Sequence, residues 1–326
     1  MDRLKPFDPC SLEQLCPGGV AYDVDLSAIS QWRIGGRARV LLRPSCTAEV
    51  ATLRRCLQEA GQPHVVIGST SNLLFADEGL NVPCIQIGPR MAGITIEGTD
   101  VQVQAGAWVP DLARRLMQAG LTGAEHVCGI PGTLGGLICM NGGSQRKGVG
   151  SHVVTVESVD AAGRIRIRTA PECGFAYRQS IYQTNGEIIT AVHLRLAPGE
   201  REAIRSEMLK ILAERRRKFP RKEPNCGSVF KSNPAMYAEI GPPGAAIERL
   251  GFKGMREGGA QVSHQHANFI VNTGAARAEE VLNLVDEIKR AVSRTTGRFL
   301  EAEVIYVSPE GDLLQADKVR AIRESG

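Results

Sequence analysis

The sequence predicts a mixed α+β protein built from two consecutive domains, with a boundary near residue 198. The chain has 326 residues, which corresponds to about two domains at roughly 150 residues each. Before the boundary, many short strand patterns are separated by glycines and interrupted by a few helical patterns. Beyond it, two longer helical patterns enclose a glycine-rich stretch and a short strand. Apolar residues make up 43% of the chain, which is enough for a packed core.

The elements of the first part follow from apolar spacing and from the residues that end each run. Residues 1–20 are polar and contain three prolines, so we expect an N-terminal extension there. A helix is predicted for 47–60, where Gly61 ends the apolar spacing, and a second helix begins at Pro110 and ends at Gly120. Short strands, the sixth and seventh of which form a hairpin, are predicted at 39–43, 64–67, 84–87, 94–97, 101–104, 153–159, 164–169 and 188–196.

The second part has fewer elements. We expect helices at 200–218 and 276–295 and strands at 268–272 and 302–307, with a glycine-rich segment at 226–260. The resulting division is an extension at 1–20, a first domain at 21–198, a second domain at 199–307 and a charged tail at 308–326.

Composition excludes several classes of protein. The net charge of +4 and the 5% aromatic content do not suit a nucleic-acid-binding surface. The N-terminus has no signal-peptide pattern, and no stretch approaches the ~20 apolar residues of a membrane span. The nine cysteines include no C-x-x-C pair, so we expect reduced thiols in a cytoplasmic protein and no zinc or other metal.

Glycine is over-represented, with 36 residues, and one glycine begins a candidate ligand loop. Gly68-Ser69-Thr70-Ser71-Asn72-Leu73 directly follows a predicted buried strand. Backbone N–H groups and hydroxyls in such a loop can face an anion, although an ordinary turn has the same composition. The dinucleotide-binding G-x-G-x-x-G and the P-loop pattern are both absent from this segment.

A second glycine cluster gives the stronger indication of a ligand. The segment Gly129-Ile130-Pro131-Gly132-Thr133-Leu134-Gly135-Gly136 combines sharp turns with two adjacent glycines that weaken a helix by ~1 kcal/mol each. Close approach of the backbone to a flat or charged ligand explains them better than chance. Two such loops in one domain suggest a large dinucleotide.

Seven motifs in a fixed order resemble those of the UDP-N-acetylenolpyruvoylglucosamine reductase family. They are Trp32-Arg-Ile-Gly35-Gly36, Gly68-x-x-Ser71-Asn72, Gly129-Ile-Pro-Gly-Thr-x-Gly-Gly136, Tyr177-Arg178-x-Ser180, Gly227-Ser228-Val-Phe-Lys231, Gly258-Gly-Ala-Gln261-Val and Glu301-x-Glu303-Val304. The resemblance covers about residues 22–307. The absence of a long insertion in 230–260 is similar to the shorter type of this family, which lacks a substrate-covering tyrosine loop.

The resemblance implies a fold, two cofactors and a reaction. The expected fold is an FAD-binding region of the vanillyl-alcohol-oxidase (PCMH) type in two subdomains, followed by a C-terminal α+β substrate domain. FAD would bind noncovalently, and NADPH would supply the hydride that reduces the enolpyruvyl ether of a UDP-sugar to a lactyl ether for peptidoglycan synthesis. The residues expected at FAD are Gly35, Gly68, Ser69, Thr70, Ser71, Asn72, Leu73, Gly106, Gly129, Ile130, Pro131, Gly132, Thr133, Gly135, Gly136, Ile188 and Arg215.

The same resemblance implies three catalytic residues. Arg178 would hold the substrate carboxylate through two parallel hydrogen bonds. Glu303 would lie beside that carboxylate, which requires a raised pKa, but strand alternation places Glu301 on the same face and does not separate the two. Ser228 would protonate the carbon that gains negative charge, assisted by Lys231, a backbone group or a water.

The proton donor stays open at this stage. Cys226 lies two residues before Ser228 and is a rival proton donor, because thiols are stronger acids than hydroxyls. The expected substrate contacts, also implied by the resemblance, are Tyr177, Lys218, Gln261 and His266.

Some segments depart from the family pattern. Hydroxyl residues occupy 69–70 where glycines are usual, and 141–147 reads Asn-Gly-Gly-Ser-Gln-Arg-Lys. Ile305 stands where many members have arginine. A related flavoprotein acting on another nucleotide sugar, or a non-catalytic flavin-binding module, is therefore the alternative. We expect a monomer.

Overall fold

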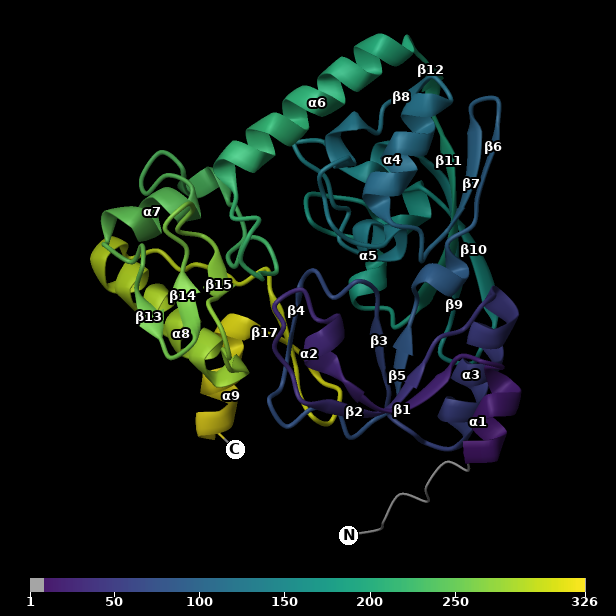
Figure 1. The fold of residues 1–326 in the computed structure, drawn as a ribbon, viewed down its shortest axis with the longest axis horizontal. Helices are drawn as coiled ribbons and strands as arrows, with labels where there is room; N and C mark the ends of the chain where they lie inside the picture. The colour runs from purple at the N-terminus through teal and green to yellow at the C-terminus, as the bar shows by residue number, and fades with distance from the viewer. Residues whose placement is uncertain (1–8, 326) are drawn as a thin grey trace. The chain divides into compact units, whose positions relative to one another are not determined.

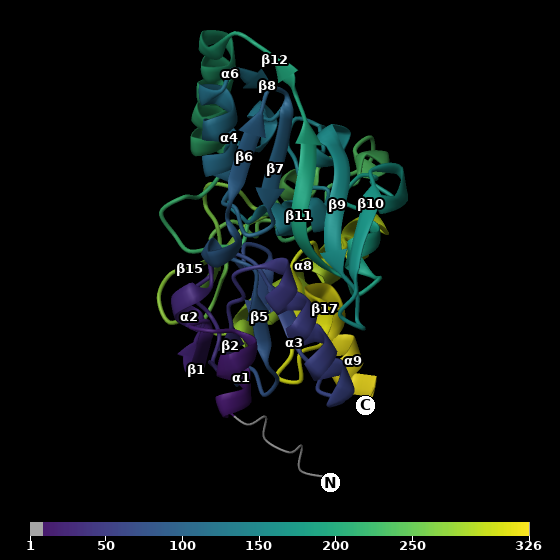
Figure 2. The ribbon, with the colours of Figure 1, turned by 90° about the vertical axis from the view of Figure 1, so that its right-hand side faces the viewer.

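The computed structural model describes residues 9–325, and these residues form two compact units (Figures 1 and 2). The first unit consists of the described residues up to Tyr22 together with Val40–Ser69 and Pro83–Arg215. The second consists of Asp23–Arg39, Thr70–Val82 and the described residues from Arg216 onward. Each unit is therefore assembled from segments that are far apart in the sequence.

The α-helices are α1 (Pro9–Leu15), α2 (Leu26–Ile29), α3 (Thr47–Glu59), α4 (Val109–Gln118), α5 (Leu134–Cys139), α6 (Arg201–Lys218), α7 (Pro243–Arg249), α8 (Ala278–Thr296) and α9 (Val319–Ser325). The strands are β1 (Val20–Asp25), β2 (Arg37–Leu42), β3 (Val65–Ile67), β4 (Leu73–Phe75), β5 (Cys84–Gln86), β6 (Ile94–Glu97), β7 (Asp100–Gln104), β8 (Leu121–Thr122), β9 (Val153–Val159), β10 (Ile165–Thr169), β11 (Ile188–Arg195), β12 (Ala197–Pro198), β13 (Arg256–Glu257), β14 (Ala260–Val262), β15 (Ile270–Asn272), β16 (Ile305–Val307) and β17 (Leu313–Gln315).

The strands form several small sheets rather than one large one. Strand orders are β1-β2-β5-β3, β10-β9-β11-β7-β6, β12-β8, β13-β14-β15 and β17-β16-β4. In the first sheet β5 runs parallel to both β2 and β3, whereas the second sheet is antiparallel throughout. In the last sheet β4 pairs in parallel with β16, which lies more than 200 residues later in the chain.

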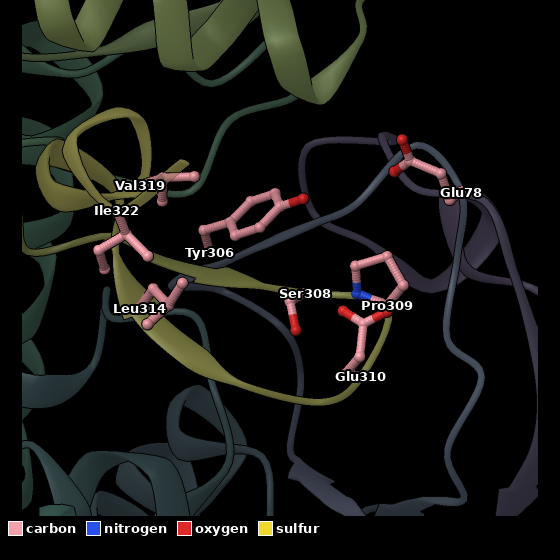
Figure 3. Close-up of a pocket in the computed structure, with 8 residues that line it drawn as sticks. All are labelled: Glu78, Tyr306, Ser308, Pro309, Glu310, Leu314, Val319 and Ile322. Carbon is pink, nitrogen blue, oxygen red and sulfur yellow. The ribbon is translucent and has the colours of Figure 1, made fainter. Parts of the chain in front are cut away.

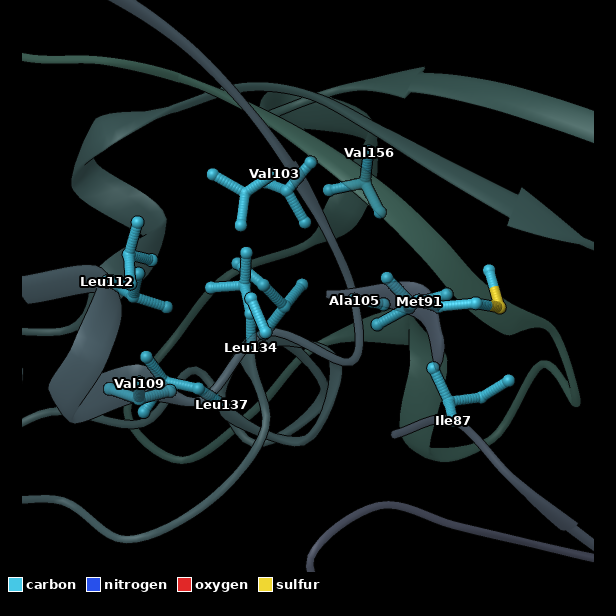
Figure 4. Close-up of a cluster of buried hydrophobic side chains, with 14 of the residues drawn as sticks. Ile87, Met91, Val103, Ala105, Val109, Leu112, Leu134, Leu137 and Val156 are labelled. Atoms are coloured by element: carbon cyan, nitrogen blue, oxygen red, sulfur yellow. The ribbon is translucent and has the colours of Figure 1, made fainter. Parts of the chain in front are cut away.

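Part of the core of the first unit lies between α4, α5 and β7. Val109 and Leu112 of α4, Leu134 and Leu137 of α5, and Val103 of β7 are all buried there (Figure 4). Burial of such side chains contributes roughly 1.5–3 kcal/mol each. Because this core holds α5 firmly, it also fixes the glycine-rich loop that precedes α5.

The core of the second unit forms around α8 and the segments beside β14 and β15. Trp32 is completely buried in it, and its ring N–H donates to the carbonyl of Ile270 at 2.8 Å. Phe230 and Val304 pack in the same cluster. Gly297, with φ of +67°, ends α8 in the left-handed region that favours glycine. This core supports the segments around residues 228 and 303.

The mixed α+β composition and most long elements are as the sequence predicts. The helices expected at 47–60, 200–218 and 276–295 correspond to α3, α6 and α8, and the hairpin at 153–169 corresponds to β9 and β10. The sequence did not predict α5, whose glycines weaken a helix, or β4, which is only three residues long.

The segments expected to be an extension and a tail also contain packed residues. Leu12 of α1 is buried in the first core, and Val319 of α9 is buried in the second. The division at 20, 198 and 307 stays a prediction. Within residues 9–325, no helix is both long and apolar enough to cross a membrane.

Candidate active site

The two predicted ligand loops of the first unit meet at Gly68 and Thr133. A Cβ atom placed on Gly68 would lie 2.4 Å from Oγ1 of Thr133, so only glycine fits at this position without movement. Thr133 is the N-cap of α5, and its hydroxyl accepts a hydrogen bond from the N–H of Gly136 at 3.4 Å. The end of β3 and the start of α5 are therefore in direct contact, as two loops that share one ligand require.

Arg215 brings a cation to the second loop. A Cβ atom on Gly129 would lie 2.6 Å from Cδ and 2.7 Å from Nε of Arg215, so the arginine side chain lies directly against the Gly129 backbone. Pro131 and Gly136 are exposed at the surface of the same loop. A guanidinium beside the Gly129 backbone can hold a phosphate group, so we expect the diphosphate of a dinucleotide at this loop.

Other glycines predicted to contact FAD also have packing reasons. A Cβ on Gly106 would lie 2.0 Å from the carbonyl oxygen of Gly88, and one on Gly135 would lie 3.1 Å from Cβ of Ala105. In the second unit, a Cβ on Gly35 would lie 2.9 Å from Cβ of Phe75. Chain packing accounts for glycine at positions 35 and 106, whereas a Cβ at position 135 would make only a tight contact. The contact of these three glycines with FAD stays a prediction.

The remaining predicted FAD residues of the first unit differ in exposure. Ile188 is buried in the first core, where it lies on β11 opposite Val159. Ile130 is half-buried, and its N–H donates to the carbonyl of Val127 in the turn that begins the second loop. Gly132 is buried and accepts a hydrogen bond from the N–H of Val109.

Arg178 lies at the tip of a tight turn. The N–H and carbonyl groups of Ala176 and Gln179 hydrogen-bond to each other, with Tyr177 and Arg178 between them. Arg178 has φ of +53°, in the left-handed region that is strained for arginine. Its Nη2 donates to the carbonyl of Gly143 at 3.1 Å, and its guanidinium lies 5.6 Å from the centre of the exposed Tyr177 ring. Tyr177 and Arg178, both predicted site residues, therefore lie together at the tip of one turn.

In the second unit, Thr70 explains one departure from the family pattern. Its φ of +56° lies in the region that favours glycine. The buried Thr70 hydroxyl donates to the carbonyl of Ile29 at 2.9 Å and accepts from the N–H of Gln31 at 3.2 Å. These hydrogen bonds compensate for the strained backbone, so the hydroxyl stabilises the loop.

Asn72 joins this loop to the segment of Glu303. The Asn72 side chain donates to the carbonyl of Glu303 at 2.9 Å, and the Asn72 carbonyl accepts from the N–H of Ile305 at 3.0 Å. Leu73 continues the contact, because it pairs with Ile305 where β4 runs parallel to β16. Asn72 thus holds the backbone of Glu303. Ser71, the residue before Asn72, is half-buried.

The segments of Ser228 and Glu303 run side by side. Phe230 forms an antiparallel bridge with Ala302, and the N–H of Glu303 donates to the carbonyl of Val229 at 2.8 Å. Because Val229 directly follows Ser228, two of the three predicted catalytic residues lie on neighbouring segments of one unit.

The two glutamates that strand alternation could not separate differ clearly in the structure. The side chain of Glu301 is 67% exposed and forms an ion pair with Lys231 at 3.5 Å. Glu303 is half-buried. Lys231, one candidate for assisting Ser228, therefore has Glu301 as its partner, and the structure favours Glu303 as the glutamate of the site.

The structure favours Ser228 over the rival proton donor Cys226. Its thiol is 3% exposed, and its Sγ lies 3.4 Å from the carbonyl oxygens of both Thr70 and Leu73. Burial raises the pKa of this thiol well above its ordinary value. Ser228 is half-buried by comparison, so Cys226 is a packed core thiol.

Lys218 and His266, both predicted to bind substrate, come together in an aromatic cluster. Lys218 Nζ lies 5.5 Å from the centre of the Phe219 ring, which lies 5.4 Å from the His266 ring and 5.1 Å from that of Phe269. Burial and the Lys218 charge lower the pKa of His266. Its Nδ1 accepts from the N–H of Asn268 at 3.2 Å, which leaves the proton on Nε2.

Gln261 belongs to a different set of contacts. Its buried side chain donates to the carbonyl of Gly254 at 2.9 Å and accepts at 3.4 Å from Arg256, which lies opposite Gln261 on β13. These contacts give Gln261 a structural function, and its contact with substrate stays a prediction.

Asn268 is a residue that the sequence analysis missed. Its buried side chain accepts from the N–H of Phe230 and donates to the carbonyl of the same residue, both at 2.9 Å. Its backbone carbonyl accepts from the N–H of Val229 at 2.9 Å. Asn268 thus holds the segment that contains Ser228. Its position in the sequence, two residues after His266, does not indicate this function.

A separate cavity of about 320 Å³ lies beside the β16–β17 hairpin (Figure 3). Its lining residues are Glu78, Tyr306, Ser308, Pro309, Glu310, Leu314, Val319 and Ile322. It includes none of the predicted site residues.

Comparison with known proteins decides the family. Residues 38–168 match the model of an FAD binding domain, and residues 219–307 match that of the C-terminal domain of UDP-N-acetylenolpyruvoylglucosamine reductase. UDP-N-acetylenolpyruvoylglucosamine reductase 1 of Corynebacterium glutamicum is 44% identical over 299 residues, which cover 92% of this chain and 89% of that relative. The chain belongs to the UDP-N-acetylenolpyruvoylglucosamine reductase family.

Other members of the reductase family agree. The enzyme of Heliobacterium modesticaldum is 39% identical over 286 residues, covering 88% of this chain and 90% of the relative. A crystal structure of the reductase from Thermus caldophilus superposes with a TM-score of 0.74 at 31% identity, covering 87% of this chain and 97% of that one. The predicted family, the α+β fold with an FAD-binding region and a C-terminal domain, the oxidoreductase class and FAD as cofactor are confirmed.

Proposed function

We propose that this chain is an FAD-dependent reductase that uses NADPH to convert the enolpyruvyl ether of UDP-N-acetylglucosamine to UDP-N-acetylmuramate for peptidoglycan synthesis. The observation that carries the proposal is the 44% identity, over 92% of the chain, to a reductase of this name. The predicted catalytic residues Arg178, Ser228 and Glu303 are all present. A paralogue for another sugar and a non-catalytic flavin module are not favoured.

The first unit offers the groups that would hold FAD. Gly68 and Thr133 join the two loops, and Arg215 places a cation against the backbone of Gly129. When bound, the flavin supplies the redox chemistry, the relay of a hydride from NADPH to the substrate. The chain itself must bind and orient the substrate and must deliver a proton.

Arg178 would bind the substrate carboxylate. Negative charge spreads onto this carboxylate after hydride addition, so a fixed guanidinium stabilises the transition state more than the ground state. The turn that presents Arg178 and its hydrogen bond to Gly143 limit the positions the side chain can take. Glu303, if neutral, would donate a hydrogen bond to the same carboxylate, which requires a raised pKa.

Ser228 would complete the reaction. Hydride addition turns the terminal CH₂ of the enolpyruvyl group into CH₃ and leaves an electron pair on the carbon that carries the carboxylate. Ser228 gives its hydroxyl proton to that carbon, and the alkoxide left behind takes a proton from water. Asn268 supports this step indirectly, since it hydrogen-bonds the backbone at Val229 and Phe230.

Lys218 and His266 would bind the nucleotide end of the substrate. The ammonium of Lys218 is a cation for the diphosphate, and Nε2 of His266 offers an N–H donor nearby. Tyr177 and Gln261 are further proposed contacts. A UDP-sugar is thus the proposed small-molecule partner, with a monomer in the cytoplasm as the expected state.

The proposal is tested with purified holoenzyme, NADPH and the enolpyruvyl ether of UDP-N-acetylglucosamine. We expect NADPH oxidation that depends on this substrate and a product heavier by two hydrogens in mass spectrometry. UDP-N-acetylglucosamine, which lacks the enolpyruvyl group, is the matched control. NADPH oxidation at the same rate with the control compound, or protein without flavin, would refute the proposal.

A further inference from the structure

The side chain of Asn141 links two loops of the first unit. Asn141 begins the segment that follows α5 and its C-cap Met140, and its Nδ2 donates to the carbonyl of Ala176 at 2.8 Å. Its Oδ1 accepts from the N–H of Gly150 at 3.0 Å. The amide therefore uses its donor and its acceptor on two different backbone segments at once.

The surroundings of this amide leave it little freedom. A Cβ atom on Gly148 would lie 2.7 Å from Oδ1 of Asn141, and one on Gly150 would lie 3.0 Å from the same atom. Both glycines thus let the backbone press against the amide. Asn141 has φ of +40°, a conformation that asparagine and aspartate tolerate better than most residues. The backbone and the side chain at position 141 are both constrained.

The partner of Asn141 is the first residue of the Arg178 turn. Ala176 and Gln179 close that turn with two backbone hydrogen bonds of 3.1 Å. The loop of Asn141 also reaches Arg178 itself, because the Gly143 carbonyl accepts from Arg178 Nη2 at 3.1 Å. One short segment therefore holds both the base of the turn and the guanidinium at its tip.

We propose that Asn141 is a positioning residue that orients Arg178 toward the substrate carboxylate. The inference rests on the proposed function, in which Arg178 binds that carboxylate. A left-handed arginine in a two-residue turn needs outside support, since strained conformations persist only where neighbouring groups over-determine them. The Asn141 amide and the Gly143 carbonyl supply this support at opposite ends of the turn.

The test replaces one atom. Asn141→Asp keeps the size, the tolerance of positive φ and the acceptor for Gly150, but places a carboxylate oxygen against the Ala176 carbonyl. Ser144→Ala is the matched control, because it removes a hydrogen bond of the same loop to the carbonyl of His126. Both are combined with Arg178→Ala in double-mutant cycles.

If Asn141 acts through Arg178, Asn141→Asp lowers kcat/KM for the enolpyruvyl substrate about 10- to 100-fold in the wild-type background. In the Arg178→Ala background the same change costs less than about 2-fold. The rate of flavin reduction by NADPH and the FAD content stay unchanged. The amide hydrogen of Gln179 exchanges faster in Asn141→Asp than in Ser144→Ala.

Equal losses in both backgrounds would overturn the inference, as would unchanged kcat/KM in Asn141→Asp. If Asn141→Asp loses FAD, Asn141→Ser, which keeps a donor and an acceptor, is carried through the same cycle with the same criteria. Failure of the proposed function gives a different result, because the wild-type enzyme then does not oxidise NADPH with the enolpyruvyl substrate at all.

Discussion

The contact between Gly68 and Thr133 predicts a specific non-additivity. In Gly68→Ala, the new Cβ lies 2.4 Å from Thr133 Oγ1, but 3.5 Å from both Cβ and Cγ2 of Thr133. Only the hydroxyl oxygen clashes, because 3.5 Å is ordinary van der Waals contact. Either Thr133 rotates and releases the N–H of Gly136, or the two loops separate.

These distances set the expected cost. Overpacking costs ~1–3 kcal/mol, and loss of the long 3.4 Å cap adds ~0.5–1 kcal/mol. Gly68→Ala should therefore lower the free energy of unfolding by ~1.5–4 kcal/mol. Thr133→Ala alone should cost ~0.5–1 kcal/mol. The double variant should cost about as much as Thr133→Ala, since the clashing oxygen is gone.

Urea unfolding of the apoprotein measures these differences, and FAD titration shows whether the junction matters for the cofactor. Gly88→Ala is the control, because its Cβ would meet Gln86 at 3.6 Å and φ there is negative. It should change the free energy of unfolding by less than ~0.5 kcal/mol. FAD affinity should fall in Gly68→Ala and recover in the double variant. Costs that simply add would refute the contact between the loops.

Three further outcomes follow from the second unit. Cys226→Ala should retain turnover, since the thiol is buried. A loss of turnover as large as that of Ser228→Ala would instead indicate that the thiol is the proton donor. Glu303→Ala should reduce kcat for the enolpyruvyl substrate at least 100-fold, because it removes the group that donates to the substrate carboxylate. Glu301→Ala, on an exposed side chain, should change kcat less than 3-fold; similar losses would contradict this distinction. The pKa of His266 lies below the ordinary 6.5 in the free enzyme, and a bound diphosphate would raise it, so substrate binding takes up a proton. Substrate affinity should accordingly increase as the pH falls through the raised His266 pKa of the complex and level off below the lowered His266 pKa of the free enzyme, and calorimetry should find no such increase in His266→Gln.

Elements with a strong local pattern could be predicted from the sequence. The helix α4 has proline in its first turn and is followed by Gly120 with φ of +70°, and both features are visible without a structure. By contrast, β4 is three residues long and exists because it pairs with Ile305 at the far end of the chain. Local propensity contains no information about such a distant partner.

The glycines show a similar limit at the site. Gly68 and Gly129 border the proposed ligand loops, as the glycine pattern suggested. Gly35 instead packs closely against Phe75, and Gly106 packs closely against the Gly88 backbone. Sequence alone does not distinguish close approach to a ligand from close approach to the chain itself, because both require the same absent Cβ atom.

The central claim, that this chain performs both half-reactions of the reductase and that Ser228 donates the proton in the second, is tested most directly by anaerobic stopped-flow absorbance with Ser228→Ala. The account predicts that NADPH reduces the bound flavin at the wild-type rate, while reoxidation by the enolpyruvyl substrate slows at least 100-fold. Reoxidation at the wild-type rate would contradict it.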